Sequence, residues 1–188
     1  MRADAKKNYQ DLLTVGRTVV LEQGANASLR DIARRANVGM GTLYRHFPTR
    51  EALLEALLRE RFDAHTVKAS ALEQSDSPGV AVVSWLRELV SLANDYRDVI
   101  AMMVAAIDDP TSALHTSCVS MKNAGARLLA RAQEAGHSRS GITGADLFAL
   151  VAALAWLGDQ PSLAPGANHL FDVIAGALFC TEGAPTKT

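Results

Sequence analysis

Two short helical segments joined by a tight turn constrain the fold of this chain more than any other feature. The stretch from Ser28 to Asp31 suits a helix start, because the serine oxygen can accept a free backbone N–H and the acid lies in the positive first turn. The helix expected over residues 28–35 ends at a turn from Ala36 to Gly39, where Asn and Gly favour a change of direction. A second short helix, over residues 41–47, ends at Pro48.

The rest of the chain has the same helical character. Apolar residues recur at spacings of three and four, and no segment alternates as a half-buried strand does. We therefore expect an all-α protein. Its nine predicted helices cover residues 4–23, 28–35, 41–47, 50–72, 78–94, 99–107, 112–135, 143–157 and 168–179. Local signals mark several ends: Gly24 and Gly136 terminate helices, Thr49 and Thr143 begin them, and Pro78 suits a first helical position.

The two short helices, supported by the helix before them, predict a helix-turn-helix, whose second helix enters the major groove of DNA. Leu43 and Phe47 are four residues apart and are expected to face the core together, so the side chains between them point outward. These side chains suit phosphates and base edges, and Arg50 is expected to bind phosphate beside the free N–H groups of the next helix. The predicted DNA-binding residues are Ser28, Gly39, Met40, Gly41, Thr42, Tyr44, Arg45, His46 and Arg50.

Charge is unevenly distributed along the chain. Residues 1–50 contain nine Lys or Arg against four acids, a formal charge of +5, and the rest of the chain carries −6. A basic end on an acidic body favours contact with a polyanion. From charge alone, a chance cluster on a solvated surface explains the asymmetry equally well.

The composition is that of a globular protein, with 48% hydrophobic and 21% charged residues among 188. Two cysteines, Cys118 and Cys180, are too few for a disulfide framework and fit a reducing compartment. The first residues lack the apolar stretch of a secretory signal, and the longest apolar run, residues 147–157, is shorter than the ~20 residues of a bilayer span. We therefore expect a cytoplasmic protein that does not associate with a membrane.

Residues about 5–64 resemble the N-terminal domain of TetR/AcrR-type transcriptional regulators. The resemblance rests on residues 28–58, SLRDIARRANVGMGTLYRHFPTREALLEALL, with the capped SLRDIA helix, the VGxGTLYxHF helix and the F-P-x-K/R-E-x-L entry to a long helix. There are four departures from the common pattern, one of which is Ala25 at a position that is often aromatic. The connection over residues 24–28 is one residue shorter, Val20 replaces a frequent Phe, and Met40 replaces a polar residue.

The resemblance implies a two-domain, all-helical regulator. A helix-turn-helix DNA-binding domain would occupy residues 1–50, and a ligand-binding and dimerisation domain residues 51–188. It also implies a homodimer that binds a palindromic double-stranded DNA operator, usually as a repressor, and leaves it when a small-molecule effector enters the C-terminal domain. An activator or a ligand-independent regulator of the same family is the alternative, as is an adaptor without operator binding. The intact face over residues 39–50 argues against lost binding.

The apolar helices near the C-terminus favour a dimer, because a small domain has little interior for so much apolar surface. The alternative is that both helices belong to the core. The predicted interface residues are Leu147, Leu150, Val151, Leu154, Leu157, Leu170, Phe171, Ile174 and Leu178.

Large apolar and sulfur-containing side chains on the central helices suit an adaptable pocket wall, although such residues more often form an ordinary core. The candidates are Trp85, Leu89, Met102, Met103, Ile107, Cys118, Met121, Phe148 and Trp156. Because charged residues are scarce among the expected interior positions, the effector is expected to be neutral and largely apolar.

Metal and enzyme chemistry are not expected. His115 and Cys118 share a helical face, but a metal site needs three or four ligands and no second pair has suitable spacing, so we expect neither a metal nor a cofactor. The sequence has no P-loop, no G-x-S-x-G, no H-E-x-x-H and no nucleophile–base pair at a meaningful spacing, so we do not expect an enzyme.

Overall fold

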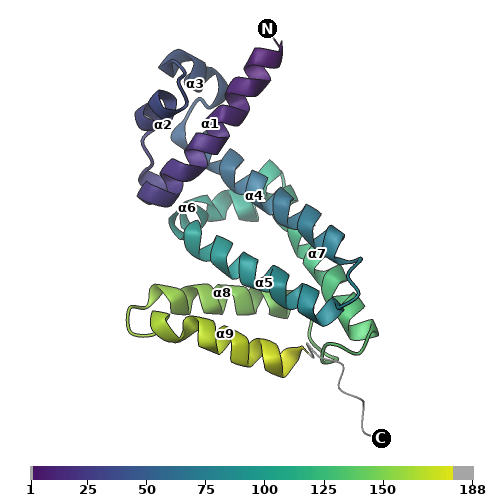
Figure 1. The fold of residues 1–188 in the computed structure, drawn as a ribbon. Coiled ribbons are helices and arrows are strands. Elements are labelled where there is room, and N and C mark those ends of the chain that lie inside the picture. Colours follow the sequence, from purple (N-terminus) through teal and green to yellow (C-terminus); the bar gives the residue numbers. More distant parts are fainter. Residues whose placement is uncertain (1, 180–188) are drawn as a thin grey trace, which may run out of the picture. The chain divides into compact units, whose positions relative to one another are not determined.

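Nine α-helices make up the described part of the chain, residues 2–179, in the computed structural model (Figure 1). They are α1 Arg2–Gln23, α2 Leu29–Arg35, α3 Met40–His46, α4 Arg50–Leu72, α5 Pro78–Asp95, α6 Arg97–Asp108, α7 Ala113–Glu134, α8 Gly144–Asp159 and α9 Ala164–Leu178, with a 3-10 turn, η1, at Gly24–Asn26. Within residues 2–179 no strand forms, and Ser138 and Phe179 make an isolated antiparallel bridge. The expected all-α fold of nine helices is confirmed.

The predicted helix starts are confirmed by their hydrogen bonds. Ser28 Oγ accepts the backbone N–H of Asp31 at 3.3 Å and caps α2. At α8, Thr143 and Asp146 cap each other's backbone N–H groups, which is the full capping box. Pro78 is the first residue of α5, where the missing N–H has no partner to lose. Local side-chain chemistry therefore sets these boundaries.

The last helix starts earlier than the sequence predicts, at Ala164 rather than at residue 168. The prediction assigns residues 161–166 to a loop, because Pro and Gly cluster there. In the structure Pro165 lies in the first turn of α9, where a helix makes no use of the N–H that proline lacks. The proline thus opens the helix, and the prediction for residues 164–166 is wrong.

The chain packs as two compact units, described here as far as residues 2–179 allow. The N-terminal unit combines Met1–Arg61 with Asp95–Thr116, and the C-terminal unit combines Phe62–Asn94 with Ser117–Thr188. This grouping differs from the predicted division at residue 50, because α6 packs against η1 of the N-terminal helices. The functional boundary at residue 50 stays a prediction.

The core of the N-terminal unit holds α1, α2, α3 and the first half of α4 together. A methyl group at Gly16 of α1 would lie 3.4 Å from Leu57 Cδ1 and 3.7 Å from Leu53 Cδ1, so α1 and α4 approach closely there. The fully buried side chains of this core include Leu12, Ile32, Leu43, Leu53 and Leu57. This packing holds α3 against its neighbours.

The core of the C-terminal unit is built around Trp85 of α5, which is fully buried. Its Nε1 donates to the backbone oxygen of His65 at 3.0 Å, and its ring meets Phe148 of α8 edge-on at 6.0 Å. Gly125 of α7 lies so close that an added methyl group would come 2.5 Å from Trp85 Cη2. Four helices therefore meet at one indole ring.

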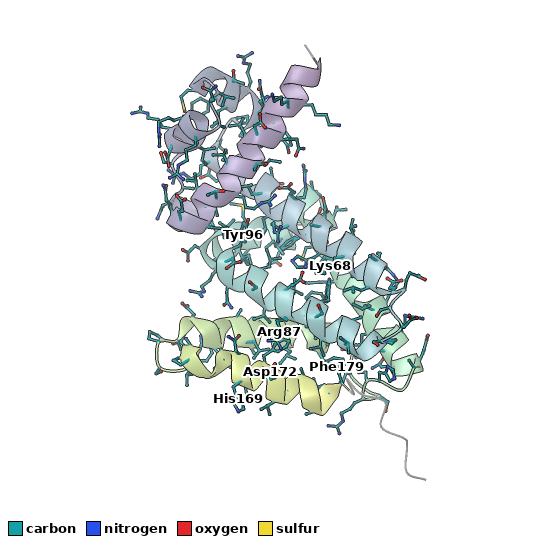
Figure 2. The ribbon with its side chains drawn as sticks, viewed as in Figure 1. Lys68, Arg87, Tyr96, His169, Asp172 and Phe179 are labelled. Atoms are coloured by element: carbon teal, nitrogen blue, oxygen red, sulfur yellow. The ribbon has the colours of Figure 1, made fainter. Side chains whose placement is uncertain are left out.

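A surface ion pair also joins α5 to α9 (Figure 2). Arg87 Nη2 lies 2.5 Å from Asp172 Oδ1, and the guanidinium lies 4.3 Å above the centre of the Phe171 ring. The cation–π contact covers the buried phenyl ring from outside.

No helix within residues 2–179 is both long enough and apolar enough to cross a bilayer.

Candidate nucleic-acid interface

Helix α3 separates an inward face from an outward face as the sequence predicts. Leu43 is fully buried and Phe47, directly after the helix, is 2% exposed. Tyr44 is 48% exposed, Arg45 is exposed, and Thr42 and His46 are half-buried. The side chains available to a partner are therefore those predicted to contact DNA.

A Schellman motif connects α2 to α3. Asn37 adopts a left-handed conformation with φ +53°, which Asn tolerates better than most residues. The N–H of Val38 donates to Ala33 O at 3.0 Å and the N–H of Asn37 to Arg34 O at 3.2 Å. These bonds satisfy carbonyls at the end of α2 and fix the turn that aims α3.

Two glycines lie at the start of α3, Gly39 as its N-cap and Gly41 inside its first turn. A methyl group at Gly39 or at Gly41 would meet no heavy atom within 4 Å from other parts of the described chain. Neither glycine has a positive φ. Because glycine weakens a helix relative to alanine, its presence at Gly41 favours an explanation from outside the chain, such as close approach of a partner.

The Arg45 side chain lies along the outward face of α3. Its Nε donates to Gly41 O at 3.0 Å and its Nη2 to Thr42 Oγ1 at 3.3 Å. It pairs with no carboxylate among residues 2–179. The guanidinium keeps its charge available to an incoming anion.

The start of α4 differs from the expected phosphate site. Thr49 Oγ1 accepts the N–H of Ala52 at 3.1 Å, which confirms Thr49 as a cap. The carboxylate of Glu51 accepts its own backbone N–H and the Thr49 hydroxyl, and these bonds lower the pKa of Glu51. Local oxygens thus occupy the N–H groups that were expected to hold a phosphate. The side chain of Arg50 is still available to a phosphate, because it is half-buried and its Nε has no partner in the described chain.

Ser28 and Met40 occupy the edges of this surface. Ser28 is half-buried, and its oxygen already accepts a backbone N–H, so only its hydroxyl proton is left for a phosphate. Met40 is the first residue of α3 and is half-buried. Ser28 thus precedes the first residue of α2 and Met40 is the first residue of α3, so both predicted contacts lie at helix starts.

Several basic residues of the N-terminal unit are paired within it. Asp31 Oδ1 lies 2.5 Å from Arg34 and its Oδ2 lies 2.9 Å from Arg35, which also lies 2.8 Å from Glu22. Hydrogen bonds donated by Arg34 and then by Arg35 lower the pKa of Asp31, and the bonds that Arg35 donates to Glu22 and Asp31 raise the pKa of Arg35. Part of the basic excess therefore fixes α2 to α1.

Tyr9 of α1 supports α3, and this contact was not predicted from the sequence. Its ring stacks on Phe47 at 5.2 Å and 29°, and meets the His46 ring edge-on at 5.9 Å and 63°. Tyr9 precedes Leu12 and Leu13 by three and four residues, so the apolar spacing of α1 could have indicated its inward direction. The outer end of α3 is thus held by an aromatic cluster.

The candidate pocket residues divide between the two units. In the N-terminal unit Met103 is buried, Ile107 is half-buried and Met102 is 43% exposed. In the C-terminal unit Phe148 is half-buried, Trp156 is 59% exposed, and the buried candidates are Trp85, Leu89, Cys118 and Met121. The contact between Trp85 and Phe148 brings two of the nine together.

The candidate dimer residues divide by burial. Within the C-terminal unit, Leu147, Val151, Leu154 and Phe171 are buried, so the core alternative applies to these four. Leu170 is 38% exposed, and the half-buried members of the set are Leu150, Leu157, Ile174 and Leu178. Sequence reasoning missed Leu163 and Val173, which are 45% and 52% exposed.

Groups of three or more His, Cys, Asp or Glu that could hold a metal are absent from residues 2–179. His115 Nδ1 lies 2.7 Å from the backbone oxygen of Ile107 and so has a structural contact. Cys118 is buried.

Both parts of the chain match described protein families. Residues 12–57 match the family described as bacterial regulatory proteins, tetR family. Residues 77–178 match the transcriptional regulator SbtR-like, C-terminal domain. The chain belongs to the TetR family. It is a helix-turn-helix transcriptional regulator with a C-terminal helical domain, and this family is one of regulators and not of enzymes.

Solved structures of similar TetR proteins align over almost the whole chain. The TetR transcriptional regulator SCO0520 of Streptomyces coelicolor is 32% identical, with a TM-score of 0.72 over 93% of this chain and 99% of that one. The TetR transcription regulatory protein of Mycobacterium vanbaalenii is 29% identical, with a TM-score of 0.73 over 95% and 98%. An HTH-type transcriptional regulator of Staphylococcus aureus, SAR0097, is 42% identical over 65 residues, which are 33% of this chain and 34% of that protein. The chain thus spans about a third of the length of this curated relative.

Proposed function

We propose that this TetR-family protein is a homodimeric, cytoplasmic repressor that binds a palindromic operator through α3 and is released by a small, mostly apolar ligand. One observation carries the DNA assignment: the outward face of α3 presents Tyr44 and Arg45 beside Gly41, a glycine that the protein's own packing does not require. A surface shaped for close approach of a polyanion accounts for both features.

The residues of this face have different roles in the proposal. Thr42 and Arg45 reach base edges or phosphates, since Arg45 can bind the N7 and O6 atoms of a guanine. Tyr44 and His46 donate to phosphates and so fix the position of α3 in the groove. Arg50 adds a phosphate contact through its side chain, and Met40 contacts a thymine methyl group or the DNA backbone.

The dimer proposal is supported by the two apolar faces of α9. Phe171 and Ala175 are buried within the C-terminal unit, whereas Leu163, Leu170 and Val173 are exposed at spacings of seven and three. A helix that is apolar on an inner and an outer face is suited to pack on both sides. A second copy of the chain is a partner that would cover the outer face. Recognition helices that read two half-sites one helical turn apart lie about 34–36 Å from each other.

The ligand proposal is supported by the mostly apolar interior of the C-terminal unit, where His65 and Ser117 are the buried polar side chains among the described residues. Other buried side chains of this unit, such as Leu89, Cys118 and Met121, are apolar or sulfur-containing, and methionine adapts to different shapes. A ligand that replaced part of this packing would need little charge. An activator or a ligand-independent regulator would use the same DNA face, because repression depends on where the operator lies relative to a promoter.

The decisive experiment is a selection of purified full-length protein against random DNA duplexes at about 150 mM salt, followed by sequencing. Enrichment of two inverted half-sites is the expected result, because each copy of a dimer reads one half-site. An enriched single half-site would refute the dimer, and salt-sensitive binding without enrichment would refute sequence-specific recognition by the free protein.

A further inference from the structure

We propose that the first turns of α1 extend the DNA interface, with Lys6 contacting a phosphate and Tyr9 acting as the positioning residue. This inference rests on the proposed DNA-binding function of α3 and adds a surface from a different helix. The N-terminal turns of α1 extend past α2 and α3 (Figure 1).

Tyr9 ties the beginning of α1 to the end of α3. Its ring lies 5.2 Å from Phe47, which is buried, and 5.9 Å from His46, which is half-buried. His46 is a proposed phosphate contact, so Tyr9 stands directly behind the DNA-facing surface. Whatever lies next to Tyr9 on the same face of α1 lies near the outer end of α3.

Lys6 occupies that neighbouring position. The inward stripe of α1 runs through Val19, Gly16, Leu12 and Tyr9 at spacings of three and four, and a further step of three reaches Lys6. At this step the stripe changes from apolar to cationic, and Lys6 is exposed. The stripe therefore continues beyond the end of the protein core, and the side chain of Lys6 is in contact with solvent.

Lys7 provides an internal comparison. At 100° per residue, Lys6 lies about 60° from Tyr9 around the helix axis, whereas Lys7 lies about 160° away, on the opposite side. Both lysines are exposed and carry the same charge. A general electrostatic attraction would use both equally, but a contact organised by Tyr9 would use Lys6.

DNA phosphate is the partner that this placement fits. A lysine acts as a flexible point charge without base readout, which suits the backbone at the edge of the groove and not its floor. Because α3 enters the groove with its N-terminal residues nearest the bases, its other end rises towards the sugar–phosphate chain. Lys6 beside that end can neutralise a phosphate next to the one held by His46.

The test measures the salt dependence of operator affinity, by fluorescence anisotropy on the selected duplex, for the full-length protein and its variants. Lys6→Ala should lower the slope of log K against log salt by about 0.9 per bound chain, and affinity by about fivefold per chain at ~0.15 M salt. Lys7→Ala should change each quantity by less than half as much. Tyr9→Phe should behave as the unchanged protein, because it keeps the ring.

Tyr9→Ala separates positioning from folding. We expect it to reduce the slope as Lys6→Ala does, and we expect Lys6→Ala to have no further effect in that variant. If Tyr9→Ala unfolds the protein, the comparison of Lys6→Ala with Lys7→Ala still shows whether Lys6 contacts the DNA. Equal effects of the two lysine variants, or no effect of Lys6→Ala, would overturn the proposal while leaving the role of α3 intact. A protein that selects no duplex at all would overturn both.

Discussion

Replacing Gly41 by alanine should stabilise the protein and weaken its binding to DNA. A methyl group at this position meets no heavy atom within 4 Å from other parts of the described chain, and the backbone is an ordinary helix, so the fold opposes nothing. Alanine is favoured over glycine in a helix by about 0.5–1 kcal/mol. For a chain of 188 residues this predicts a melting temperature higher by about 1–4 °C in thermal unfolding followed by circular dichroism.

The same methyl group should obstruct DNA. If the backbone at Gly41 approaches the groove closely, the added carbon forces α3 to retreat, and losses like those of a mismatched base pair, about 1–3 kcal/mol, are expected. Operator affinity, measured by fluorescence anisotropy, should fall about 5- to 150-fold. Affinity for a scrambled duplex should change little, because non-specific binding depends on charge. A lower melting temperature would show that the fold requires the glycine, and unchanged operator affinity would refute its place at the DNA.

Four further changes test other parts of the structure. Gly125→Ala should lower the melting temperature, because its methyl group would lie 2.5 Å from Trp85 Cη2 and overpacking costs about 1–3 kcal/mol, more than the helix propensity gained; an unchanged melting temperature would contradict this close packing. Tyr44→Ala should weaken operator binding by about 1–3 kcal/mol with little change in melting temperature, since the side chain is 48% exposed; equal operator affinity would remove Tyr44 from the interface. Val173→Glu should give a monomer in analytical ultracentrifugation, because this 52% exposed side chain lies on the outer face of α9 that a second copy is proposed to cover, and a persistent dimer at micromolar concentration would exclude that face. Asp31→Asn should lower stability to urea at pH 7. Arginine hydrogen bonds hold the pKa of Asp31 below 3.8 in the folded protein, so its stabilisation is present above about pH 3.8 and disappears as the pH falls through the lowered pKa; a stability difference that stays constant down to pH 2 would contradict this origin.

Helix boundaries were largely predictable because their signals are local. The oxygen of Ser28 and the pair Thr143 and Asp146 act within one turn, so the sequence contains the whole interaction. Pro165 shows the limit of such signals. Proline is common both in loops and in the first turn of a helix, and the choice at residue 165 depends on how the residues after it pack in the fold.

The packing partners of the helices were less predictable. When a helix is apolar on two faces, its sequence does not show which face packs against the rest of the unit. Helix α8 is apolar almost throughout, so its period does not distinguish the buried Leu154 from the exposed Trp156. In the structure Leu154 faces the interior of the C-terminal unit, and Trp156 points away from it. The predicted DNA face was clearer, since Leu43 and Phe47 are the apolar members of a short polar helix and its flank.

The N-terminal segment shows that the number of basic residues in a sequence can exceed the number of cations available to bind DNA. Residues 1–50 carry +5, but Arg17 lies 3.3 Å from Glu60, and Arg34 and Arg35 share Asp31. Such exposed pairs add little to stability, yet each one neutralises a cation that could otherwise displace a counterion from DNA. The basic residues that can bind phosphate are therefore those outside these pairs, such as Arg45 on the outward face of α3. The number of such cations, and not the formal charge of the segment, sets how strongly salt opposes DNA binding.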